Sequence, residues 1–202
     1  MKASAQQLLS LLLLPLSVIA APAGEIEARA CSAVTVIFAR GTTETPTLGT
    51  VIGPQFLAAL RSSFGANAVT MNGVPYAADV PGFLQGGDPT GSKVMANMVS
   101  SALSSCPETK LVISGYSQGG QLVHNAAKLL PAATTAKIAA AVIFGDPDNG
   151  SPVQGVPAAK TKIICHAGDN ICQHGSMILM PHLTYGMDAT AAAAFVKQVA
   201  GS

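Results

Sequence analysis

The sequence predicts an α/β fold in which helices cover both faces of a five-stranded parallel sheet, as a three-layer sandwich. Continuous apolar runs indicate buried strands near residues 33–39, 68–71, 111–113, 138–144 and 162–165. Longer segments with apolar residues at helical spacing lie between these runs. Because strands and helices alternate along the chain, the strands are expected to run parallel with helices on both sides.

The first half of the chain contains two predicted strand and helix pairs. The apolar run at 33–39 is followed by a segment, 51–64, whose apolar residues recur every three or four positions. The weaker run at 68–71 precedes a second such segment, 92–105, which Pro107 should end. Ligands of parallel sheets bind beyond the carboxyl ends of the strands, so the loops that follow strands are the expected place for chemistry.

The second half continues the alternation. A strand at 110–114 leads directly into a helix over 118–130, which Pro131 should end. The runs at 138–144 and 162–165 complete the sheet, and an Ala-rich helix closes the chain.

Residues 1–20 have the pattern of a secretory signal peptide, with Lys2 ahead of a leucine-rich run and small residues at its end. A membrane anchor is the alternative, but the apolar stretch is short and contains Pro15. We expect 21–30 to be a linker or short pro-segment and 31–202 to be a single extracellular domain. No later apolar run approaches the roughly 18 residues of a spanning helix, so integral membrane association is not expected.

The composition excludes several function classes. Only 10% of residues are charged and the formal net charge is +1, so a basic nucleic-acid-binding surface is not expected. Aromatic residues make up 4% and Trp is absent, which leaves no platform for stacking sugars or bases. We expect a monomer.

Four cysteines in a secreted chain indicate two disulfides, for which three pairings are possible. Cys31 and Cys106 each stand just before a predicted strand, so neighbouring parallel strands would bring them to one edge of the sheet. Cys165 closes another strand and lies at the opposite edge. The expected pairs are therefore Cys31 with Cys106 and Cys165 with Cys172; a zinc site is disfavoured because no spacing is C-x-x-C.

A candidate nucleophile, Ser117, lies in the sequence G-Y-S-Q-G at 115–119. The motif follows a predicted strand and opens a predicted helix, which is the strand-turn-helix setting of a nucleophile elbow. Its glycines would let the backbone hold a strained turn, and the helix N-terminus would favour a developing oxyanion. The alternative is a glycine-rich turn that only connects strand to helix.

The acid of such a site follows the nucleophile in the chain and typically lies after the second following strand. This position selects Asp169, which lies inside the Cys165–Cys172 loop. Asp146 and Asp148 are the alternatives, although both are also suited to turns and helix capping.

The expected general base is His182, because it lies between the acid and the last helix. His124 lies on the helix after the nucleophile and cannot easily bend back over it. His166 is still at a strand end, and His174 is too close in sequence to Asp169.

The oxyanion of an acyl transfer needs at least two donors. Gln118, directly after the nucleophile, supplies its backbone N–H, and Thr42, in the loop after the first strand, offers an N–H and a hydroxyl. The alternative is that the threonines of this loop only cap a turn. Two apolar loops are expected to form a surface for hydrophobic acyl chains, with core packing as the alternative, and their candidate residues are Val80, Pro81, Phe83, Leu84, Ile178, Leu179, Met180 and Leu183.

These motifs together resemble the fungal cutinase family of small secreted serine esterases. The matching sequences are A-R-G-T-T-E at 39–44, G-Y-S-Q-G at 115–119, C-x-x-x-D-x-x-C at 165–172 and P-H-L-T-Y-G at 181–186. The resemblance runs from about Cys31 to the C-terminus. It departs at Thr42, because the first oxyanion residue is often Ser in this family.

The resemblance implies a minimal α/β-hydrolase fold without a large lid and the hydrolysis of cutin, a plant polyester, or of small esters. It implies a triad of Ser117, Asp169 and His182, with Thr42 and Gln118 as oxyanion donors. It also implies the disulfide pairing given above, and no metal or organic cofactor is required. Acetylxylan esterases look similar around the serine, so an acetylxylan esterase is the alternative enzyme, and a non-catalytic secreted binding protein is the alternative outside enzymes.

Overall fold

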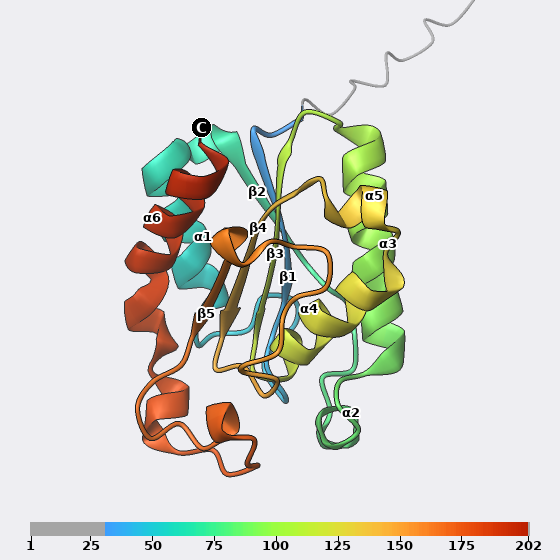
Figure 1. Cartoon of the computed structure of the whole chain (residues 1–202). Coiled ribbons are helices and arrows are strands. Elements are labelled where there is room, and N and C mark those ends of the chain that lie inside the picture. The colour runs from blue at the N-terminus through green and yellow to red at the C-terminus, as the bar shows by residue number, and fades with distance from the viewer. Residues whose placement is uncertain (1–30, 202) are drawn as a thin grey trace, which may run out of the picture. The chain divides into compact units, whose positions relative to one another are not determined.

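The computed structural model describes residues 31–201, which form a parallel sheet covered by helices on both faces (Figure 1). The strands run in the spatial order β2-β1-β3-β4-β5 and all neighbouring pairs are parallel. Their bounds are β1 Val34–Ala39, β2 Val69–Gly73, β3 Lys110–Tyr116, β4 Ile138–Phe144 and β5 Thr161–Ile164. The predicted α/β class, the five strands and their parallel arrangement are confirmed.

Two layers of helices sandwich this sheet. Figure 1 shows α1 and α6 on one face and α3, α4 and the short α5 on the other. The helices are α1 Gly53–Phe64, α2 Val80–Leu84, α3 Pro89–Ser105, α4 Gln118–Leu129, α5 Ala132–Thr135 and α6 Ala189–Ala200. Single turns of 3₁₀-helix are η1 Ala66–Ala68, η2 Ala158–Lys160, η3 Ile171–Gln173, η4 Met180–Leu183 and η5 Tyr185–Asp188.

The core has one hydrophobic cluster on each side of the sheet. Phe38, Phe56 and Phe144 are fully buried on the α1 and α6 side, whereas Met95 and Leu122 are fully buried on the α3 and α4 side. β1 and β4 are buried at every position, while β2 at the sheet edge alternates between more and less buried residues. The edge position of β2 explains why its apolar signal in the sequence is the weakest.

Both predicted disulfides are present. Cys31 and Cys106 are bonded with their Cα atoms 5.6 Å apart, and each lies shortly before one of the paired parallel strands β1 and β3. Cys165 and Cys172 are bonded across the loop that follows β5, with Cα atoms 6.0 Å apart. The second disulfide closes a seven-residue separation, so it fixes one loop rather than distant parts of the chain.

Two helix starts differ from the sequence-based expectation. The apolar segment at 80–84, expected to be a loop, is the short helix α2, capped by the Asp79 side chain, which accepts the Gly82 N–H at 2.8 Å. Helix α3 begins at Pro89 rather than near residue 92, because Asp88 caps it in the same way through the Gly91 N–H. In both cases an Asp followed by a proline in the first turn marks the start.

The predicted signal peptide at 1–20 and linker at 21–30 lie outside the described residues. Among residues 31–201, no helix is both long and apolar enough to cross a membrane.

Candidate active site

Ser117 occupies a sharp turn between β3 and α4, at the carboxyl edge of the sheet. Its backbone φ is 55° and ψ is −123°, in a region that non-glycine residues rarely adopt. A Cβ atom at Gly115 would collide with the Gly119 backbone, and a Cβ atom at Gly119 would collide with the carbonyl group of Ala39. The two glycines therefore allow the close packing that the strained turn requires, as the motif predicts.

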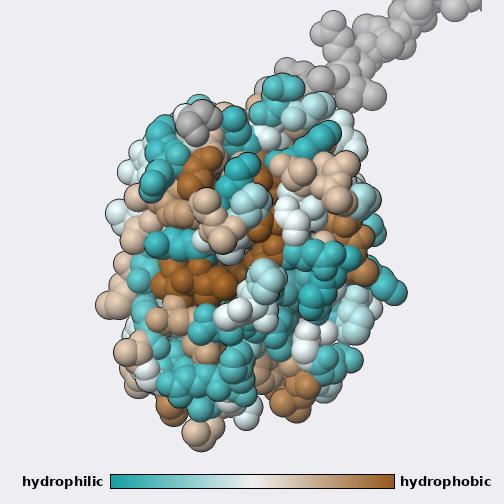
Figure 2. Space-filling view, viewed as in Figure 1, coloured by the Kyte–Doolittle hydropathy of each residue, from teal (hydrophilic) through white to brown (hydrophobic). Residues whose placement is uncertain are grey.

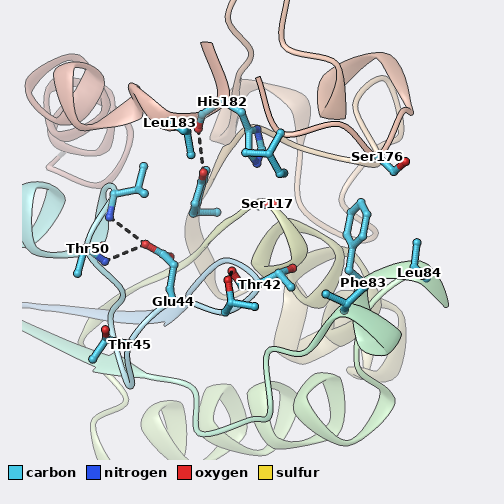
Figure 3. Close-up of a pocket in the computed structure, with 15 residues that line it drawn as sticks. Thr42, Glu44, Thr45, Thr50, Phe83, Leu84, Ser117, Ser176, His182 and Leu183 are labelled. Carbon is cyan, nitrogen blue, oxygen red and sulfur yellow. Dashed lines mark hydrogen bonds between the residues drawn. The ribbon is translucent and has the colours of Figure 1, made fainter. Parts of the chain in front are cut away.

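Ser117 and His182 line the same cavity, which has a volume of about 600 Å³ (Figure 3). The serine comes from the β3–α4 turn and the histidine from η4, which lie 65 residues apart in the sequence. Both residues are almost fully buried, with exposed fractions of 4% and 1%. A hydroxyl and an imidazole that share one cavity can take part in the same reaction.

The imidazole of His182 pairs with a buried carboxylate on its far side. Its Nδ1 lies 2.9 Å from Oδ2 of Asp169, to which it donates a hydrogen bond because an ionised carboxylate can only accept. Its Nε2 is buried and has no hydrogen-bond partner among the described residues. A proton on Nδ1 leaves the lone pair on Nε2, so this nitrogen is available to accept a proton.

Asp169 is held by further donors. Its Oδ2 also accepts the Tyr185 hydroxyl at 2.6 Å, and its Oδ1 accepts the Ile171 backbone N–H at 3.0 Å. Burial alone raises the pKa of Asp169, but the hydrogen bonds from Tyr185 and His182, the nearby imidazole and the Ile171 N–H lower it by more. The net result is a lowered pKa, so Asp169 is ionised at neutral pH.

Two tyrosines that the sequence analysis did not select also hold the histidine and the acid. Tyr116 stacks on the His182 ring with centroids 5.0 Å apart and donates its hydroxyl to the His182 carbonyl at 2.8 Å. Burial raises the pKa of both Tyr116 and Tyr185, so both phenols keep the protons that they donate. Their positions inside G-Y-S-Q-G and P-H-L-T-Y-G are the only sequence signal for these roles.

The alternative acids lie in a different arrangement. Asp146 accepts a hydrogen bond from His124 at 2.9 Å, and both side chains are buried beside α4. The Asp148 backbone N–H donates to Oδ1 of Asp146, which is the turn chemistry expected for this segment. None of these three residues lines the cavity that contains Ser117.

His166 and His174 form hydrogen bonds with groups outside the cavity. His166 Nε2 lies 2.7 Å from the Asp188 carboxylate, and His174 Nδ1 lies 2.8 Å from the Pro147 carbonyl. Neither histidine lines the cavity. Among the four histidines in the described residues, His182 alone shares the cavity with Ser117.

Thr42 lines the cavity on the side opposite His182 (Figure 3). Its Oγ1 accepts a hydrogen bond at 2.9 Å from Nε2 of Gln118, which also donates to the Asp79 carbonyl at 2.8 Å. The Gln118 side chain is fully buried and therefore fixed. Because the Thr42 oxygen already accepts from Gln118, its own hydrogen is free to be donated into the cavity.

A carboxylate that the sequence analysis also missed holds the Thr42 loop. Glu44 accepts three backbone N–H groups, from Gly41 at 2.7 Å, Thr50 at 2.8 Å and Val51 at 2.9 Å. Figure 3 shows the last two of these bonds on the wall of the cavity. Glu44 thus ties both ends of the 41–51 loop together, which fixes the position of Thr42.

The structure allows a test of Thr42. We expect Thr42→Val to lower kcat about 100-fold with little change in KM, because an oxyanion donor acts mainly in the transition state. Thr42→Ser keeps a hydroxyl and is expected to retain most of the activity. Steady-state hydrolysis of a short-chain p-nitrophenyl ester measures both variants, and equal rates for the valine variant and the wild type would contradict the role.

The eight predicted apolar contact residues divide into two groups. Five line the cavity: Val80, Phe83, Leu84, Ile178 and Leu183. Pro81, Leu179 and Met180 do not line it and are exposed, Met180 by 71%. Figure 2 shows hydrophobic side chains among hydrophilic ones at the end of the molecule where α2 lies in Figure 1. The cavity therefore opens beside an apolar rim.

Within residues 31–201, no group of three or more His, Cys, Asp or Glu side chains is arranged to hold a metal ion.

A family model and two similar relatives name the same family. A family model described as Cutinase matches residues 30–199. The chain is 95% identical to a cutinase of Monilinia fructicola and 81% identical to one of Botryotinia fuckeliana, with 100% of each chain covered.

Two solved structures are also similar. A Trichoderma reesei cutinase in complex with a phosphonate inhibitor matches with a TM-score of 0.81 and 52% identity, over 84% of this chain and 77% of that one. An acetylxylan esterase matches with a TM-score of 0.67 and 27% identity, over 85% of this chain and all of the other.

Proposed function

The chain belongs to the cutinase family and is a serine esterase, and on this premise we propose that Ser117, His182 and Asp169 hydrolyse cutin and short-chain hydrophobic esters. The assignment of these three residues rests on one observation. In the cavity that holds Ser117, the His182 ring donates from Nδ1 to an ionised carboxylate and keeps Nε2 free of any described partner. This is the state in which an imidazole can take the proton of a serine hydroxyl.

The reaction proceeds in two halves. In the first, Nε2 of His182 takes the Ser117 proton as the serine oxygen attacks the ester carbonyl, and the imidazolium then gives that proton to the leaving alcohol. In the second, His182 takes a proton from water as the water oxygen attacks the acyl-enzyme, and the imidazolium then returns that proton to the Ser117 oxygen as the acid is released. Asp169 keeps the ring oriented throughout and stabilises its charged form.

The oxyanion of each tetrahedral intermediate is held by the backbone N–H of Gln118 and by Thr42. The hydrogen bond from the Gln118 side chain to the Thr42 oxygen supports this role, because it leaves the threonine hydrogen for the oxyanion. The first turn of α4, a 12-residue helix, adds the favourable end of its dipole.

The apolar side chains at the cavity support the proposal that the substrates are hydrophobic esters. Apolar side chains, among them Val80, Phe83 and Ile178, line the cavity beside threonine and serine hydroxyls, and exposed apolar side chains such as Met180 lie next to them in the sequence. An acyl chain of a polyester can lie against such a surface with little cost in desolvation of polar groups. We also propose that residues 31–202 act as a monomer outside the cell after removal of 1–20. The cavity is complete within one chain, and two disulfides suit an oxidising compartment.

Covalent labelling and a substrate panel test the proposal. An organophosphonate is expected to add once per chain, on the peptide that contains Ser117, and to abolish hydrolysis. The purified protein is then compared on p-nitrophenyl butyrate, solid cutin and acetylated xylan, with cutin monomers expected to be released and acetate release from xylan slow. A label on another residue would contradict the assignment of Ser117 as the nucleophile. Faster hydrolysis of acetylated xylan than of cutin would contradict the proposed substrate.

A further inference from the structure

His166 makes a pattern of contacts that the proposed mechanism does not use. Its Nδ1 lies 2.9 Å from the Pro181 carbonyl oxygen and its Nε2 lies 2.7 Å from Oδ2 of Asp188. A carbonyl and a carboxylate can only accept hydrogen bonds, so both ring nitrogens must donate. Only the imidazolium form has both protons. The Thr184 hydroxyl fits this state, since it donates to the same Pro181 carbonyl and can accept from Nδ1.

Through these contacts, His166 reaches the residues next to His182 and Asp169. The carbonyl that His166 holds belongs to Pro181, the residue before His182, so the bond fixes the start of the turn that carries the base. The His166 ring also stacks on Tyr185, with centroids 4.1 Å apart and an interplanar angle of 20°. Tyr185 in turn donates its hydroxyl to Asp169. One ring therefore supports the surroundings of both members of the His182–Asp169 pair.

We propose that His166, in its charged form, is a positioning residue that holds the His182 turn through the Pro181 carbonyl, with Asp188 as its counter-ion. The proposal rests on the proposed function, because it takes His182 as the base. His166 is only partly buried, with 20% of its side chain exposed, so it can exchange protons with solvent.

The two hydrogen bonds depend on both ring protons. The groups against the ring are Asp188 and Tyr185, with Asp169 beyond the tyrosine hydroxyl and His182 beyond Pro181. With only one proton on the ring, one nitrogen would be an acceptor facing another acceptor, and either the Pro181 carbonyl or the Asp188 carboxylate would lose its hydrogen bond. The turn carrying His182 would then be held less firmly.

Two substitutions of His166 separate the hydrogen bond from the charge. His166→Phe keeps a flat ring against Tyr185 but has no donor, and we expect kcat to fall about tenfold through misplacement of the base, with KM unchanged. In His166→Asn, the amide nitrogen lies where Nδ1 lies, so it can still donate to the Pro181 carbonyl. We expect this variant to recover most of kcat, because the bond to the Pro181 carbonyl is kept.

Asp188→Asn tests the counter-ion. The Asp188 side chain makes no capping hydrogen bond to α6, so the change removes a charge without removing a cap. The change also takes away the carboxylate that accepts from Nε2 of His166, and we expect kcat to fall by less than in His166→Phe, because the bond to the Pro181 carbonyl remains. His174→Asn is the matched control, since His174 bonds a carbonyl of another loop and is expected to leave kcat unchanged.

The experiment combines steady-state kcat and KM of these variants with ¹⁵N spectra of histidine-labelled wild-type protein. The His166 signals, identified by their loss in His166→Phe, are expected to show both ring nitrogens protonated. A neutral ring, or a kcat of His166→Phe equal to that of the wild type, would overturn the positioning role. If His182→Gln kept its activity, the proposed function itself would fail, which is a separate result.

Discussion

Ser117→Ala is expected to lower kcat for a short-chain p-nitrophenyl ester by about 10⁶-fold, to the level left by binding and the oxyanion donors. The loss is this large because the hydroxyl that forms the acyl-enzyme in the proposed mechanism is gone. The Ser117 side chain makes no capping hydrogen bond to α4. The melting temperature of the variant is therefore expected to match that of the wild type, which shows that chemistry and not folding has been lost.

Ser114→Ala is the matched control for this experiment. Ser114 lies three residues earlier on β3, is fully buried, and its hydroxyl has no hydrogen-bond partner among the described residues. Removing an unpaired buried hydroxyl should leave kcat unchanged and leave stability equal or slightly higher. Retained turnover in the Ser117 variant would contradict its assignment as nucleophile, as would an equal loss in both variants.

The sequence predicts the fold well where burial is uniform. β1 and β4 are buried at every position, so they appear as continuous apolar runs whatever their neighbours are. The Ser117 turn is equally visible, because close packing and a positive φ demand glycines at fixed positions. The short helix α2 is harder to predict, since its five residues include both Pro81 and Gly82.

The supporting contacts of the site could not be predicted in the same way. Glu44 binds three backbone N–H groups and Tyr116 donates to a backbone carbonyl, and backbone groups carry no residue-specific signal. The chain also contains two buried His–Asp pairs with the same 2.9 Å separation, His182–Asp169 and His124–Asp146. Chain order favours the first pair, but only the fold determines which one reaches the cavity with the nucleophile.

Asp169→Asn is expected to lower kcat about 10⁴-fold while the fold is retained. In the wild type the carboxylate accepts from Nδ1 of His182 and leaves Nε2 free to act as a base. The asparagine amide can instead donate to Nδ1, which moves the ring proton to Nε2. His182 then faces the cavity as a donor and cannot take a proton from Ser117, so the effect should appear in kcat and hardly in KM.

Asp146→Asn is a control of the same chemistry at the other buried pair. It changes a carboxylate that also accepts from a histidine, but it lies outside the cavity, so we expect a loss of stability with most of the activity kept. If the two asparagine variants exchanged these phenotypes, the acid of the site would be Asp146 and not Asp169.

The lowered pKa of Asp169 gives a second readout of the same substitution. A carboxyl whose pKa is lower in the folded than in the unfolded state contributes stability above the unfolded value, about 3.9, and loses it as the pH falls through the folded value. The asparagine variant lacks this contribution at every pH. Thermal unfolding should therefore show a difference between wild type and variant that narrows as the pH falls below about 4. A difference that does not change with pH would mean that the ionised carboxylate is not what Tyr185 and His182 stabilise.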